Sequence, residues 1–88
     1  MIRRRVVVHG RVQGVFFRET VRRAAAQRGV AGWVRNNADG TVEAAFEGEP
    51  DAVDRLVETC REGPRGAVID RVEVFDERAE NMLGFEVR

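Results

Sequence analysis

Between the first strand-like segment and the first helix-like segment the chain reads Gly10-Arg11-Val12-Gln13-Gly14-Val15-Phe16-Phe17-Arg18. Two glycines allow such a loop to expose its backbone N–H groups, and the helix after it adds the positive end of its dipole. An anion fits a loop of this kind, and Arg18, just inside the helix, could close over a phosphate. Two interpretations are open at this point, a phosphate-binding loop and a plain strand-to-helix connection.

The segments on either side of this loop have the spacing of regular secondary structure. Arg3–His9 contains three consecutive valines, which predicts a buried strand. Apolar residues recur at helical spacing from Phe17 to Arg28, and Gly29 suits the position just after a helix.

The middle of the chain predicts a β-hairpin. Val30–Arg35 and Thr41–Glu47 are the strands, and the turn at residues 36–40 ends in Asp-Gly, a strong hairpin signal. Apolar and polar residues alternate along the second of these strands, so we expect one buried and one wet face. The expected buried residues are Val42, Ala44 and Phe46, and the expected wet residues are Thr41, Glu43 and Glu47.

A second helix begins after Gly48, with Pro50 at its first position, and ends at Gly63-Pro64. Its apolar stripe consists of Val53, Leu56, Val57 and Cys60. A fourth strand contains Ile69, Val72 and Val74, and a short terminal strand contains Phe85 and Val87. The order β-α-β-β-α-β predicts an α+β, ferredoxin-like sandwich. We expect a single domain over residues 1–88, with a mostly antiparallel sheet of four to five strands and both helices on one face.

The composition excludes several kinds of chemistry. The net charge is zero, all 15 basic residues are arginine, and lysine, serine and tyrosine are absent. A serine nucleophile, a Schiff-base lysine and a P-loop lysine are therefore excluded, and a general nucleic-acid binder would carry a basic excess. The single cysteine, Cys60, suits a reducing compartment, and no apolar run approaches the length of a membrane span. We expect a cytoplasmic monomer without nucleic-acid or membrane partners.

A second group of candidate residues lies around the hairpin. Asn36 ends a strand, where its amide could either form the turn or orient a water molecule. Trp33 is expected to pack in the core or as a wall, and His9 to make a structural hydrogen bond. Cys60 is expected to be an inert core thiol, and one His and one Cys far apart predict no metal site. The run at residues 3–5 is expected to be solvated or to blunt a strand edge.

Together, the two regions resemble one family. The pattern Gly10-x-Val12-Gln13-Gly14-Val15-x-Phe17-Arg18 is similar to the first signature of the acylphosphatases. The pattern Gly32-Trp33-Val34-Arg35-Asn36-x-x-x-Gly40-x-Val42, continuing to Gly48, is similar to the second. The order and spacing agree over essentially the whole chain.

This resemblance implies an enzyme that hydrolyses the carboxyl–phosphate bond of acyl phosphates to carboxylate and inorganic phosphate. Arg18 would bind the phosphoryl group and Asn36 would orient the attacking water, with no covalent intermediate, metal or cofactor. Inorganic phosphate would be both product and competitive inhibitor. The implied phosphate-binding loop consists of Arg11, Val12, Gln13, Gly14, Val15, Phe16 and Phe17.

Two non-catalytic alternatives share the same predicted fold. An RNA-binding module would need aromatic side chains on the open face of the sheet, for which Phe75 and Phe85 are the candidates. A regulatory phosphate-binding domain would keep the loop and Arg18 but would not need Asn36. The sequence shows no pocket that would select the acyl group.

Overall fold

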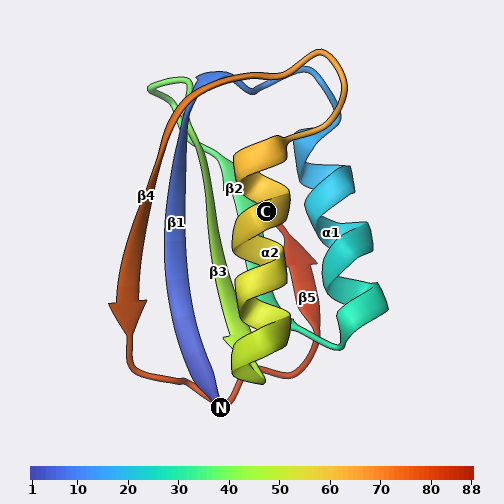
Figure 1. Cartoon of the computed structure of the whole chain (residues 1–88), viewed down its shortest axis with the longest axis vertical. Coiled ribbons are helices and arrows are strands. Elements are labelled where there is room, and N and C mark those ends of the chain that lie inside the picture. The colour runs from blue at the N-terminus through green and yellow to red at the C-terminus, as the bar shows by residue number, and fades with distance from the viewer.

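The computed structural model describes all 88 residues and has the predicted order of elements. The elements are β1 (Ile2–Arg11), α1 (Phe17–Arg28), β2 (Ala31–Asn36), β3 (Val42–Gly48), α2 (Pro50–Glu62), β4 (Val68–Glu77) and β5 (Phe85–Val87). They form a five-stranded sheet in the order β4-β1-β3-β2-β5, antiparallel except between β2 and β5. The ferredoxin-like fold is confirmed, and Figure 1 shows both helices covering the same face of the sheet.

The core lies between the helices and that face. α1 contributes Phe17, Val21 and Ala25, which are four residues apart, and α2 contributes the predicted apolar stripe. The sheet contributes alternate residues of its three central strands, because successive side chains of a strand point to opposite faces. Gly29, with φ +64°, ends α1 and donates its N–H to the Ala25 carbonyl, as predicted for a residue after a helix.

The prediction that one face of β3 is exposed to water is wrong, because Thr41, Glu43 and Glu47 are all buried. Glu47 is only 2% exposed, and Arg3 on the neighbouring strand is 5% exposed. The expectation that residues 3–5 are solvated or blunt an edge is likewise wrong for Arg3, since β1 lies between β4 and β3 inside the sheet. Buried charges require partners, and this face supplies them across the strands.

The partners form a continuous chain of ion pairs, here called the arginine–glutamate layer. Its members are Arg3, Arg5, Arg35, Glu43, Glu47 and Glu77. Arg3 contacts Glu47 at 3.4 Å and Glu77 at 3.1 Å. Arg5 contacts Glu77 and Glu43, each at 2.9 Å, and Arg35 contacts Glu43 at 2.9 Å. This layer covers the face of the sheet that the helices leave open.

A bulge ends the regular part of β1. The pairing register with β4 shifts between His9 and Gly10, and Gly10 has φ +133°. A Cβ atom at Gly10 would lie 2.0 Å from the Val68 carbonyl oxygen, so only glycine fits. A bulge bends its strand and redirects the chain beyond it, and in this protein the chain beyond it is the loop to α1.

Candidate active site

One cavity lies at the end of the sheet where the β1–α1 loop, the start of α1 and the ends of β2 and β5 meet. Its volume is about 400 Å³. The residues that line it are Val12, Gly14, Phe16, Phe17, Arg18, Glu19, Asn36 and Val87. Arg18 and Asn36, eighteen positions apart in the sequence, therefore share one cavity with the glycine-containing loop.

The loop presents backbone donors that have no partner in the chain. None of the N–H groups of residues 13–16 donates to a backbone carbonyl, and the first bond of α1 runs from Thr20 N–H to the Phe16 carbonyl. The N–H groups of the first helical turn are also free, as in any helix. Gly14 and Phe16 both have positive φ, +76° and +61°. In loops where left-handed and right-handed residues alternate, successive N–H groups can point toward one place, which is the arrangement of an anion-binding nest.

Arg18 supplies a guanidinium without an acidic side-chain partner. Eight other arginines make ion pairs within 4.0 Å of an acidic side chain, including Arg22, which pairs with Glu19. The only hydrogen bond of the Arg18 side chain is a long one, 3.4 Å from Nη1 to the main-chain oxygen of Arg88. Its remaining donors are free to meet an anion in the cavity.

Asn36 and Asn37 are neighbours with different surroundings. The Asn37 amide donates to Thr41 Oγ1 at 3.0 Å and to Glu43 Oε1 at 3.1 Å, so it holds the hairpin turn together. The half-buried Asn36 amide makes no hydrogen bond within the chain and lines the cavity. The turn-forming role that was one interpretation of Asn36 is thus filled by Asn37.

Gln13 has a role that the sequence pattern did not reveal. Its Nε2 donates to the Asn37 carbonyl at 2.7 Å and to the Thr41 carbonyl at 2.9 Å. The side chain therefore joins the loop to the hairpin that carries Asn36. Gln13 and the hairpin are more than twenty residues apart in the sequence, and only the folded arrangement brings them together.

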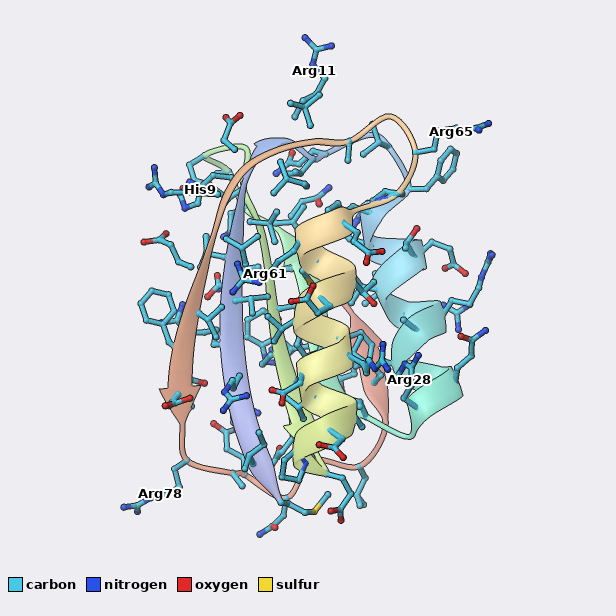
Figure 2. The ribbon with its side chains drawn as sticks, viewed as in Figure 1. His9, Arg11, Arg28, Arg61, Arg65 and Arg78 are labelled. Atoms are coloured by element: carbon cyan, nitrogen blue, oxygen red, sulfur yellow. The ribbon has the colours of Figure 1, made fainter.

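The other singled-out residues lie outside the cavity. Figure 2 shows the Arg11 side chain projecting away from the molecule, which leaves only its backbone for the loop. His9 Nε2 lies 2.6 Å from Glu73 Oε1, in agreement with a structural hydrogen bond. Cys60 is fully buried, and burial raises the pKa of its thiol to about 12, so it stays protonated as an inert core thiol. The Trp33 ring packs against the guanidinium groups of Arg35 and Arg88, which lie over it.

The aromatic residues do not form a base-stacking surface. Phe85 stacks on the core residue Phe46 with 6.0 Å between ring centroids, so it belongs to the helix side of the sheet. Phe75 lies on the open face beneath the Arg5 guanidinium, 4.4 Å from its ring centroid. The open face also carries Trp33, which is buried beneath Arg35 and Arg88, and the arginine–glutamate layer, in which the positive charges are already paired. This arrangement disfavours the RNA-binding alternative.

None of the helices is long and apolar enough to cross a bilayer.

Comparison with known proteins agrees with these features. Residues 4–87 match the acylphosphatase family. An acylphosphatase of Gloeobacter violaceus is 54% identical over 86 residues, which cover 98% of this chain and 92% of that protein. One of Rubrobacter xylanophilus is 59% identical over 96% of this chain and 77% of its own length. The crystal structure of acylphosphatase from Bacillus subtilis superimposes with a TM-score of 0.95 at 37% identity, covering 100% of this chain and 99% of that one. The chain therefore belongs to the acylphosphatase family and is an enzyme that hydrolyses acyl phosphates.

Proposed function

We propose that the cavity holds the phosphoryl group of the substrate against the N–H groups of the Arg11–Phe17 loop and the Arg18 guanidinium, while Asn36 orients the attacking water. One observation carries this proposal. The unpaired loop donors, the guanidinium without an acidic side-chain partner and the amide without a hydrogen bond all border the same cavity.

The donors suit a phosphoryl group in both charge and geometry. The loop N–H groups and the start of α1 concentrate positive potential where the phosphate oxygens would lie. A guanidinium grips two of these oxygens at once and does not lose its proton. Negative charge develops on the phosphoryl oxygens and the departing oxygen in the transition state, so donors fixed in advance lower the barrier.

Asn36 can position water but cannot accept its proton. Its Oδ1 would accept a hydrogen bond from the water and aim the oxygen lone pair at phosphorus. A bond forms from the water oxygen to phosphorus as the bond from phosphorus to the carboxylate oxygen breaks, and the carboxylate leaves with the electron pair. The water proton passes to a phosphoryl oxygen of the substrate itself. A carboxylate is a stable leaving group, so no general acid is required.

Direct attack by water is favoured over attack by a nucleophilic side chain of the protein. Serine and lysine are absent, and the Cys60 thiol is buried and protonated. His9 is hydrogen-bonded to Glu73 and does not line the cavity. Direct attack by water therefore accounts for the reaction with the groups that border the cavity.

The test is hydrolysis of acetyl phosphate, with EDTA present, by wild type and four variants. Arg18→Gln removes a transition-state donor and Asn36→Ala removes the group that positions the water, and each should lower kcat/KM about 100-fold or more. Binding of inorganic phosphate should weaken in Arg18→Gln and change little in Asn36→Ala. Arg28→Gln is the matched control for Arg18→Gln, because Arg28 is an exposed arginine of α1 that makes no ion pair and does not line the cavity. Gln27→Ala, on the exposed surface of α1, controls for amide loss.

Three results would contradict the proposal. The first is full activity in folded Arg18→Gln or Asn36→Ala. The second is inhibition by inorganic phosphate that is purely noncompetitive with substrate. The third is incorporation of heavy oxygen from labelled water into the carboxylate product instead of the phosphate, because that label would place the attack at the acyl carbon.

A further inference from the structure

Phe16 combines two unfavourable features at the rim of the cavity. Its side chain is 84% exposed, although Phe is among the residues that gain most from burial. Its backbone is left-handed, with φ +61° and ψ +27°, which is an outlier for a bulky residue. Asn81 is the only other non-glycine residue with positive φ, and asparagine tolerates that region. Strain of this kind persists where the surrounding structure imposes it, and it clusters at functional sites.

The cavity is larger than its phosphate-binding part. The polar groups proposed to hold the phosphoryl group lie at the loop, Arg18 and Asn36, whereas half of the eight lining residues are hydrophobic. Of those, Val12 and Phe17 are buried in the core, while Phe16 and Val87 are exposed. An acyl phosphate is phosphate at one end only, so its acyl group has to extend from the loop along the remaining wall. Phe16 and Val87 are the exposed apolar side chains that this wall offers.

We infer that Phe16, with Val87 beside the same cavity, is the binding surface for the acyl group and gives the enzyme a preference for acyl phosphates with aromatic acyl groups. The inference rests on the proposed function, because it takes the phosphoryl group to be held by the loop and Arg18. The ring of Phe16 borders the cavity and is exposed rather than packed in the core. An aromatic acyl group would stack on this ring and bury apolar surface against it, whereas an acetyl group has little apolar surface to bury.

The experiment compares kcat/KM for benzoyl phosphate and acetyl phosphate in the same preparations. Phe16→Asn removes the ring but keeps a residue that adopts the left-handed conformation. It should lower the benzoyl-to-acetyl ratio about tenfold, mainly through a higher KM for benzoyl phosphate. Phe16→Tyr keeps the ring and should keep the ratio. Leu83→Asn makes the same kind of change at an exposed apolar residue outside the cavity and should leave both substrates unaffected.

The ratio separates this inference from the proposed function. A change in loop geometry would affect both substrates alike, so an unchanged ratio in Phe16→Asn would overturn the role of Phe16, whatever the absolute rates. Arg18→Gln, measured with acetyl phosphate in parallel, tests the phosphate site alone. If Arg18→Gln loses activity and the Phe16→Asn ratio does not move, only the acyl-group inference fails. If Arg18→Gln keeps full activity, the proposed phosphate site fails first.

Discussion

The β1–α1 loop and the arginine–glutamate layer use the same kinds of groups in opposite ways. In the layer every charged side chain has a partner, and the Glu47 carboxylate also accepts the backbone N–H groups of Glu80, Asn81 and Met82. In the loop the N–H groups of residues 13–16 and most donors of Arg18 have none. Both regions are rich in donors, so composition does not distinguish them. The two regions differ in whether their donors are already satisfied within the chain.

Charge pairing and position at the cavity together distinguish Arg18 from the arginines that support the fold. Arg3 is held by three carboxylates, those of the buried Glu47, the part-buried Glu77 and the exposed Glu80, and moving it would leave the Glu47 charge in the protein interior without its cation. Arg18 is exposed and makes no ion pair with an acidic side chain, since the adjacent Glu19 pairs with Arg22, so binding a phosphate would displace no such pair. We expect substitutions in the layer to change stability and substitutions at the cavity to change catalysis.

The largest effect on stability is expected at Arg3. Arg3→Met would leave Glu47 buried without its cation, and breaking a buried pair in this way costs about 3–5 kcal/mol. Arg4→Met is the matched control on the adjacent residue, because Arg4 and its partners Asp54 and Asp76 are more exposed and such pairs contribute little to stability. Urea unfolding at neutral pH measures both values.

The activity of Arg3→Met tests whether the arginine–glutamate layer affects catalysis as well as stability. Arg3→Met should keep the kcat/KM of wild type for acetyl phosphate at temperatures where the variant is folded. Equal stability losses in Arg3→Met and Arg4→Met would show that the buried layer is no stronger than a surface ion pair.

The sequence was sufficient to predict the order of the elements, because each has a local signature. The valines of β1, the helical spacing after Phe17, the Asp-Gly turn and Pro50 at the start of α2 each indicate one element without reference to the others. The helix-side core could be predicted from the same periodicities. β5 was predicted as well, although it has only three residues, Phe85–Val87.

The open face of the sheet could not be predicted from one strand at a time. Alternation along β3 assigns Glu43 and Glu47 to water, and only the pairing of β3 with β1 places Arg3 directly opposite Glu47. Arg3 and Arg5 are two residues apart, the spacing of one strand face, and this was the available signal. At the site, the loop, Arg18 and Asn36 were visible as a pattern, whereas the side-chain contacts of Gln13 and the backbone strain of Phe16 depend on the folded geometry.

Acid should weaken the layer. Burial opposes ionisation of Glu47, but the N–H groups of residues 80–82 and the Arg3 guanidinium outweigh it and lower the pKa below the ordinary value of 4.5. Burial is likewise outweighed at Glu43 by Arg35, Asn37 and Arg5, so its pKa is also lowered. A carboxylate with a lowered pKa in the folded state contributes stability above its unfolded pKa and loses it as the pH falls through the folded one.

We therefore expect the free energy of unfolding to fall as the pH decreases from about 5 to about 3. In Glu47→Gln the protein should be less stable at neutral pH, and its stability should depend less steeply on pH in that window. Urea unfolding at a series of pH values measures both slopes. Parallel curves for wild type and Glu47→Gln would show that Glu47 does not carry this dependence.

Gln13 connects the two regions, and its expected effect is the smallest. Gln13 lies in the β1–α1 loop, and its Nε2 donates to two carbonyls of the hairpin. Asn37 of this hairpin donates in turn to Glu43 of the arginine–glutamate layer. We expect Gln13 to be a positioning residue that sets the distance between the phosphate-binding loop and Asn36. Loss of its two hydrogen bonds in Gln13→Ala should lower kcat about tenfold and stability by about 1–2 kcal/mol. Gln27→Ala, the same substitution at the other glutamine of the chain, should change neither.

A double-mutant cycle distinguishes positioning from a general loss of stability. If Gln13 acts by placing the loop relative to Asn36, then Gln13→Ala should cost much less activity in an Asn36→Ala background than in wild type. If it only stabilises the fold, its effect on kcat, measured well below the unfolding temperature, should be the same in both backgrounds. Additive effects would thus show that Gln13 only stabilises the fold. Non-additive effects would show that Gln13 holds the β1–α1 loop, whose donors are unpaired, in place against the hairpin that is bonded to the arginine–glutamate layer.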